Sequence, residues 1–130
     1  MNNTNETYKD LPLVYSCSGC SNVAQLANDI ALKLDQEKIA EMSCIAGVGG
    51  EVPHLVALAK SGREIIAIDG CPLACAKACL AKHNINPHLH FELSKFSIKK
   101  TYHQKCEPKE FENMYQCIED KIQKNKLTKH

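Results

Sequence analysis

The chain has 130 residues, of which 44% are hydrophobic and 24% are charged. This length predicts one domain with a substantial core, and the hydrophobic share excludes wholesale disorder. The net charge of +1 and the presence of a single arginine, Arg63, argue against nucleic acid as a partner. No apolar run reaches the roughly 18 residues that a membrane span needs, and residues 1–11 contain no apolar leader segment. We therefore predict a cytoplasmic protein without a membrane partner.

Apolar runs that predict strands alternate with helical patterns along the chain. The predicted strands are residues 13–16, 40–46, 64–69 and 89–93, and the predicted helices are residues 22–34, 52–61, 72–83 and a last helix that begins at Pro108. Pro72 and Pro108 both fit the first turn of a helix, where the missing N–H costs nothing. A fifth strand is also considered at residues 98–103, where the pattern is ambiguous. The third strand is apolar at consecutive positions, as in a strand covered on both faces.

This order predicts an α/β fold, namely a single three-layer, Rossmann-like or flavodoxin-like domain with a mostly parallel sheet of four or five strands. If the first strand lies between the second and the third, the residue at its carboxyl end is flanked by the ends of the other two. Residues 1–10 are predicted to be poorly ordered, residues 11–93 to form the core, and residues 94–130 to form a C-terminal extension with a packing helix in the same domain. The lysine surplus of this extension is interpreted as a solvated helix face.

Eight cysteines are too many to explain as disulfides in a reducing compartment, so they indicate metal binding or redox chemistry. Cys17, Cys44 and Cys71 follow one another at intervals of 27 residues, each where an apolar run ends and a turn begins. Because the carboxyl ends of parallel strands meet at one edge of the sheet, where ligands bind in open α/β folds, we expect these thiols to approach one another.

Two further thiols adjoin this edge. Cys75 is four residues beyond Cys71 and would point back toward it from the same helix face. Cys20 has the spacing from Cys17 that lets two thiolates hold one ion. We therefore predict a metal site formed by Cys17, Cys20, Cys44, Cys71 and Cys75. Zinc is preferred over an iron–sulfur cluster, because four thiolates around Zn²⁺ form a common site that needs no cofactor assembly.

The remaining polar and thiol residues have simpler interpretations. Buried cysteine often acts as a small apolar side chain, and this interpretation is preferred for three residues, Cys79, Cys106 and Cys117. Gly47-Val48-Gly49-Gly50 is interpreted as a tight turn in preference to an anion cradle. Asp69 is expected to cap a helix or support a ligand, with a role as a base less favoured. A second metal site at His88 and His90, or a role for His54 in the site, is also less favoured.

Three segments resemble the DGC-domain family of zinc-binding proteins. They are Tyr15-Ser16-Cys17-Ser18-Gly19, Met42-Ser43-Cys44-Ile45-Ala46-Gly47 and Ile68-Asp69-Gly70-Cys71-Pro72-Leu73-Ala74-Cys75-Ala76-Lys77. The resemblance covers about residues 11–93. It implies zinc held by four cysteines, which correspond here to Cys17, Cys44, Cys71 and Cys75, with Cys20 less firmly part of the pattern.

The leading hypothesis is therefore a small zinc-binding protein that acts as a metal-binding or interaction module for an unidentified protein or small molecule. In the alternative hypothesis, the protein is a thiol, redox or metal-assisted enzyme that uses Cys20 or an open metal position. A third hypothesis is an iron–sulfur electron carrier.

Overall fold

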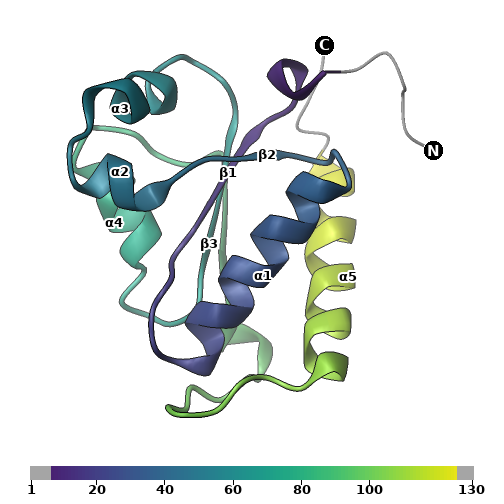
Figure 1. Ribbon diagram of the computed structural model, residues 1–130. Helices are drawn as coiled ribbons and strands as arrows, with labels where there is room; N and C mark the ends of the chain where they lie inside the picture. The colour runs from purple at the N-terminus through teal and green to yellow at the C-terminus, as the bar shows by residue number, and fades with distance from the viewer. Residues whose placement is uncertain (1–6, 126–130) are drawn as a thin grey trace.

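In the computed structural model, residues 7–125 are described, and they form a parallel four-stranded sheet with helices on both faces (Figure 1). The strands are β1 (Leu13–Ser16), β2 (Glu41–Met42), β3 (Ile65–Asp69) and β4 (Leu89–Glu92). The helices are α1 (Asn22–Gln36), α2 (Ile45–Gly49), α3 (Pro53–Ala59), α4 (Cys75–Ala81) and α5 (Pro108–Asn125), with 3-10 helices η1 (Tyr8–Asp10) and η2 (Leu93–Phe96). The predicted α/β class is confirmed. The order β2-β1-β3-β4 places β1 between β2 and β3, which is the order considered in the sequence analysis.

The sheet is the middle of three layers. In Figure 1, α1 and α5 lie side by side on one face, and α2, α3 and α4 lie on the other. The alternation of side chains along β1 follows from this arrangement, because successive residues of a strand point to opposite faces. Val14 packs in the cluster that contains the buried face of α1 and α5, whereas Leu13 and Tyr15 pack in the cluster on the opposite face. Cover on both faces explains why every residue of β3 is buried.

Helix α1 begins immediately after the turn that carries Cys17 and Cys20. The Ser21 hydroxyl accepts a hydrogen bond from the Ala24 N–H at 3.1 Å, which is the arrangement of an N-cap. Apolar residues at helical spacing then hold the helix against the sheet, and they are Val23, Leu26, Ala27, Ile30, Ala31 and Leu34. The cap and this apolar face fix the turn at the carboxyl end of β1.

The second predicted strand is much shorter than its apolar run. Only Glu41–Met42 pair with β1, and Cys44 is the residue that precedes α2. Gly47 and Gly49 lie within α2, so they form neither a tight turn nor an anion cradle. They instead allow α2 to pack closely against α3 and α4. A Cβ at Gly47 would clash with Leu55 of α3, and a Cβ at Gly49 would lie 2.9 Å from the Cys79 sulfur of α4.

The predicted helix start at Pro72 was wrong, because α4 begins at Cys75. Pro72 instead occupies a turn closed by a hydrogen bond from the Ala74 N–H to the Cys71 carbonyl at 3.0 Å. Ala74 has left-handed backbone angles (φ 50°, ψ 54°), which a right-handed helix cannot include. Cys71 therefore lies on a loop and does not share a helix face with Cys75.

The fifth strand considered at residues 98–103 is absent, since Tyr102 makes only an isolated antiparallel bridge with Ser21. The side chain of Asn22 bonds backbone groups of this segment in place of a neighbouring strand. Its side-chain N–H donates to the Lys99 carbonyl at 2.9 Å, and its side-chain oxygen accepts from the Thr101 N–H at 2.6 Å. Residues 99–102, called the strap below, are thereby tied to the first residue of α1.

The sequence predictions for the two ends of the chain can be compared with the described residues. Helix α5 confirms the predicted helix at Pro108, and it buries Met114, Tyr115, Ile118 and Ile122 against the core. Of the ten N-terminal residues predicted to be poorly ordered, Tyr8–Asp10 form η1, and residues 1–6 lie outside the described residues. Within residues 7–125, no helix combines the length and the apolar character needed to cross a membrane.

Candidate functional site

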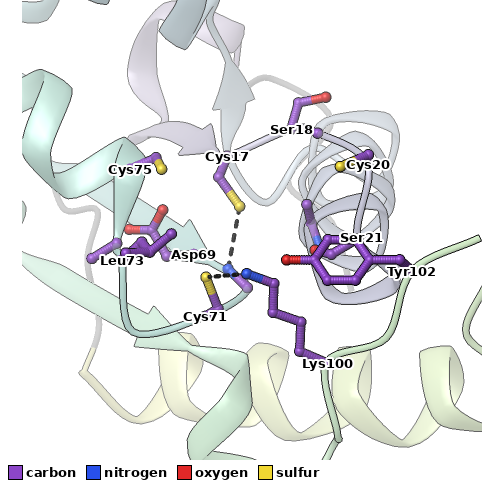
Figure 2. Close-up of a pocket in the computed structure, with 14 residues that line it drawn as sticks. Cys17, Ser18, Cys20, Ser21, Asp69, Cys71, Leu73, Cys75, Lys100 and Tyr102 are labelled. Atoms are coloured by element: carbon purple, nitrogen blue, oxygen red, sulfur yellow. Dashed lines mark hydrogen bonds between the residues drawn. The ribbon is translucent and has the colours of Figure 1, made fainter.

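A pocket of about 220 Å³ opens at the carboxyl edge of the sheet, between the loops that follow β1 and β3. This is the switch point at which ligands bind in flavodoxin-like sheets. The pocket, called the thiol pocket below, is lined by four cysteines together with the strap, and these cysteines are Cys17, Cys20, Cys71 and Cys75. Figure 2 shows them around the pocket with Asp69, Lys100 and Tyr102. The structure therefore brings together four of the five predicted ligands.

Cys17 is the innermost of these thiols, with 8% of its surface exposed. Its sulfur accepts a hydrogen bond from the Gly70 N–H at 3.2 Å, the contact drawn in Figure 2. Burial raises the pKa of Cys17 to about 11, because the charged thiolate loses its hydration. The Gly70 N–H acts in the opposite direction, and the nearby Asp69, Cys75 and Cys71 raise the pKa further. Cys71 and Cys75 are thus within electrostatic range of Cys17.

The other three thiols of the pocket are more accessible. Cys71 is half-buried, and its sulfur lies 3.5 Å from the Lys100 ammonium, which donates to it. Cys75 is exposed and is the first residue of α4. Cys20 is exposed in the turn before α1, on the opposite side of the pocket in Figure 2. The pocket therefore combines one buried thiol with three that can react with solutes.

Cys44 is placed elsewhere. It lines a separate pocket beside β2, together with Ser16, Met42 and Ser43. Cys44 also lies near Tyr15. The pKa of Tyr15 is raised mainly by burial, and Cys44 makes the smallest contribution to this shift. Because β2 and β3 flank β1 on opposite sides, Cys44 and Cys71 leave the sheet on opposite sides of Cys17. The equal spacing in sequence therefore does not place Cys44 in the thiol pocket.

The thiol side chains are not gathered around one point in this structure. Within residues 7–125, no three His, Cys, Asp or Glu side chains are arranged so that they could hold a metal ion. The chemistry of the donor set nevertheless suits a soft divalent ion, since four sulfurs line one pocket and one of them already accepts a backbone N–H. Binding would require the side chains to turn toward a common centre.

Asp69 supports the loop that carries Cys71 and Cys75. Its buried carboxylate accepts hydrogen bonds from the Ala76 N–H at 2.7 Å and the Lys77 N–H at 3.1 Å, so it caps α4 as the sequence predicted. The same carboxylate lies 2.8 Å from Nε2 of His90. These contacts join the end of β3 to the start of α4 and to β4, and they fix the loop between them.

The histidines near the site are engaged separately. Nδ1 of His88 accepts a hydrogen bond from the Ile65 N–H at 3.0 Å, whereas His90 contacts Asp69. The two imidazole rings therefore contact different partners. His54 is exposed at the start of α3 and is absent from the residues that line the thiol pocket.

Sequence reasoning missed the residues that the strap contributes. Lys100 and Tyr102 line the thiol pocket, although the lysines of this region were interpreted as a solvated face. The Lys100 ammonium also lies 5.4 Å from the centre of the Tyr102 ring. No local signal could have found these residues, because their position depends on Asn22, which is 77 residues from Lys99 in sequence.

The cysteines interpreted as structural lie outside the thiol pocket. Cys79 is half-buried on α4 beside Gly49, and burial raises its pKa. The Cys106 thiol lies 3.7 Å from the Asn22 carbonyl, to which it donates. Cys117 is half-buried on α5. Cys117 therefore offers a control position far from the pocket in sequence and on a different layer of the fold.

The raised pKa of Cys17 predicts a loss of stability of the metal-free protein at alkaline pH. The unfolded thiol loses its proton near pH 9, whereas the folded thiol keeps it to about pH 11. The contribution is complete below pH 9 and is lost as the pH rises to 11, because only the unfolded chain releases the proton in that range. Two pH units correspond to roughly 2 to 3 kcal/mol. Urea titrations should show this extra fall in the wild type relative to Cys17→Ala, and parallel curves would contradict it.

Comparison with known proteins shows the family of this chain. The family model described as the DGC domain matches residues 13–118, so the chain belongs to the DGC-domain family, as its three motifs predicted. The match includes the strap and much of α5. A relative from Pseudomonas aeruginosa (strain PAO1), named "Anaerobic and virulence modulator AnvM", is 62% identical over 105 residues, which cover 81% of this chain and 80% of the relative. No solved structure matches the chain.

Proposed function

We propose that this protein is a metal-binding regulatory module in which Cys17, Cys20, Cys71 and Cys75 hold one zinc ion. The observation that carries the proposal is the presence of these four sulfurs on one pocket, at the switch point between β1 and β3. Membership of the DGC-domain family supports a role for the cysteines after β1 and β3.

Zinc suits this donor set better than a harder ion. Thiolates favour zinc and iron–sulfur clusters, and Zn²⁺ with four thiolates is common in structural sites. A bound zinc ion would cross-link the loops that follow β1 and β3. The Gly70 N–H would support Cys17 as a ligand, because hydrogen bonds to a metal-bound sulfur offset part of its charge.

Cys20 is proposed as the fourth ligand in preference to Cys44. The family resemblance points to Cys44, but Cys44 lines the other pocket beside β2. Cys20 lines the same pocket as the remaining three cysteines, and it is exposed. Cys20 lies three residues after Cys17, in the turn between β1 and α1 that lines the pocket.

A regulatory role is favoured over an enzymatic one for two reasons. An ion closed by four thiolates keeps no open position for a substrate. The P. aeruginosa relative is named a modulator, and the identity of 62% makes a role of that kind the natural proposal for this chain. The thiol-enzyme alternative rests on the exposed Cys20 beside the other thiols. An iron–sulfur cluster would use the same four sulfurs, and a brown anaerobic preparation would reveal it.

Metal content after single cysteine substitutions tests the ligand set. Dividing the roughly 10 to 16 kcal/mol of a structural zinc site over four thiolates gives about 3 kcal/mol each, so a lost ligand should weaken binding by more than about a hundredfold. We expect Cys71→Ser and Cys20→Ser to lose zinc on purification without added metal. Cys44→Ser and the control Cys117→Ser should retain it.

Three outcomes separate the competing sites. Loss of zinc from Cys44→Ser with retention in Cys20→Ser would replace Cys20 by Cys44 in the site. Retention of zinc in Cys71→Ser would reject the thiol pocket as the site. If Cys20→Ser keeps its zinc but loses a thiol-exchange reaction that the wild type performs, the enzyme alternative is supported. Circular dichroism and gel filtration confirm that each variant is folded.

A further inference from the structure

The thiol pocket has a cationic side chain that belongs to none of its cysteine loops. Lys100 comes from the strap, and among residues 7–125 it is the only lysine or arginine that lines the pocket. Its ammonium donates to the Cys71 sulfur at 3.5 Å and lies over the Tyr102 ring. Figure 2 shows the lysine side chain directed into the pocket toward Cys71. The strap thus brings a positive charge to a site built from potential anions.

We propose that Lys100 is a positioning residue of the metal centre, whose ammonium offsets the negative charge of the metal–thiolate group at Cys71, and that Asn22 holds it there. This inference rests on the proposed zinc site and deepens it. It adds the C-terminal strap to the site, in addition to the two cysteine loops.

The charge of the proposed centre explains why a cation is needed. Four thiolates and one Zn²⁺ carry a net charge of −2, and the buried carboxylate of Asp69 lies on the same pocket. Asp69 is itself an anion, and its oxygens are engaged by the start of α4 and by His90, so it adds to the negative charge of the pocket. The fixed charge of Lys100 lowers the energy of the metal-bound state more than that of a neutral thiol pocket, because the interaction grows with the negative charge beside it.

The backbone around Lys100 is held in place, which distinguishes it from a solvated lysine. Asn22 bonds the residue on either side, through the Lys99 carbonyl and the Thr101 N–H. Asn22 is itself buried, with 6% of its surface exposed, and its own N–H donates to the Thr101 carbonyl at 3.0 Å. The bridge between Tyr102 and Ser21 extends the attachment. The strap therefore fixes the backbone of Lys100 beside Cys71, so that only the lysine side chain has to be ordered.

Two features make Lys100 testable. Lys99 precedes it on the strap, is exposed and is absent from the pocket, so it is a matched control for the loss of one positive charge. An arginine at position 100 would keep the charge and the hydrogen-bond donors with a different shape. Methionine at position 100 keeps most of the aliphatic stem and removes the charge. A role in charge compensation therefore predicts weaker binding in Lys100→Met and rescue by arginine, whereas a role in packing the stem predicts no loss in Lys100→Met.

The experiment compares Zn²⁺ affinities of the full chain by competition with a chromophoric chelator, at low and high salt. We expect Lys100→Met to bind zinc about two- to tenfold more weakly at low salt, a difference that shrinks at high salt. Lys100→Arg and Lys99→Met should stay close to the wild type. Asn22→Ala should weaken zinc binding in the same direction, although it keeps the lysine. With Co²⁺ in place of zinc, the sulfur-to-metal charge-transfer band should shift in Lys100→Met and in Asn22→Ala, and it should stay unchanged in Lys99→Met.

The results separate this inference from the proposed function. If the wild type binds no zinc, the proposed function fails and this inference fails with it. If the wild type binds zinc and Lys100→Met binds equally well, the zinc site stands and the role of Lys100 is rejected. Equal losses in Lys99→Met and Lys100→Met would also reject it, because the effect would then be one of overall charge. Thermal unfolding of the metal-free variants shows whether each is folded.

Discussion

Replacing Gly70 with alanine should lower the free energy of unfolding by about 3 kcal/mol or prevent folding altogether. A Cβ at this position would lie 2.6 Å from the Val23 carbonyl carbon, 2.7 Å from the Val23 oxygen and 2.8 Å from the Ala24 nitrogen. These are backbone atoms of the first turn of α1, which the buried side chain of Val23 and the Ser21 cap hold in place. The end of β3 and the start of α1 would have to separate, and the Gly70 N–H would move away from the Cys17 sulfur.

Gly19→Ala is the matched control. A Cβ at Gly19 would meet only the Ala24 Cβ at 3.9 Å, which is an ordinary contact. The free energy of unfolding from urea titrations should therefore change by less than about 0.5 kcal/mol in this variant. If Gly70→Ala were as stable as Gly19→Ala, the close approach of β3 and α1 at the thiol pocket would be wrong.

Asp69→Ala is expected to cost about 3 kcal/mol of stability, because the N–H groups at the start of α4 lose their acceptor in a buried place. The carboxylate oxygens accept from the Ala76 and Lys77 N–H groups and contact His90, and the residue has no exposed surface. Asp69→Asn keeps one acceptor oxygen, so it should cost about half as much. Chemical denaturation of the metal-free protein measures both differences without a contribution from a bound ion.

Glu51→Gln provides the comparison with a surface carboxylate. Glu51 pairs with Lys82 at 2.8 Å, but both side chains are more than half exposed. Surface ion pairs of this kind contribute little, so the free energy of unfolding should stay almost unchanged. A similar small effect for Asp69→Ala would show that the Asp69 carboxylate does not hold the loop between Gly70 and Cys75.

The sequence predicted the fold well where burial alone decides the structure. The consecutive apolar residues of β3 require cover on both faces of the sheet, and all of them are buried in the structure. The apolar spacing of α1 and its serine cap are local signals that act within one turn of helix. Given the strand order, right-handed crossovers explain why α1 lies on one face of the sheet and α2, α3 and α4 on the other.

The predictions that were wrong concern positions at which contacts with residues distant in sequence determine the local structure. Pro72 is compatible with a helix start and with a turn, and the left-handed Ala74 selects the turn. Residues 98–103 have an ambiguous pattern, and the Asn22 side chain bonds the Lys99 carbonyl and the Thr101 N–H in place of a neighbouring strand. The sequence has no local record of either choice.

The candidate site was predictable in part for the same reason. Cys17 and Cys71 follow adjacent strands, so the strand ends alone bring them to one edge. The equal spacing of Cys44 suggested a third equivalent position, but β2 lies on the other side of β1 and its loop lines a different pocket. The position of Lys100 in the pocket depends on the attachment of the strap to α1, which cannot be predicted from the spacing of residues in the sequence.

Alkylation of the zinc-loaded wild type, mapped at each cysteine by mass spectrometry, tests most directly whether one ion is held by sulfurs of the two loops. We expect one zinc per chain. Cys20, Cys71 and Cys75 should be protected from alkylation until a chelator is added, whereas Cys44 should be modified at once. In the structure Cys20, Cys44 and Cys75 are exposed and Cys71 is half-buried, so only a bound ion would protect the three thiols of the pocket. Cys17 should be protected in both states because it is buried. Equal modification of Cys20, Cys71 and Cys75 with and without zinc would contradict the proposed site.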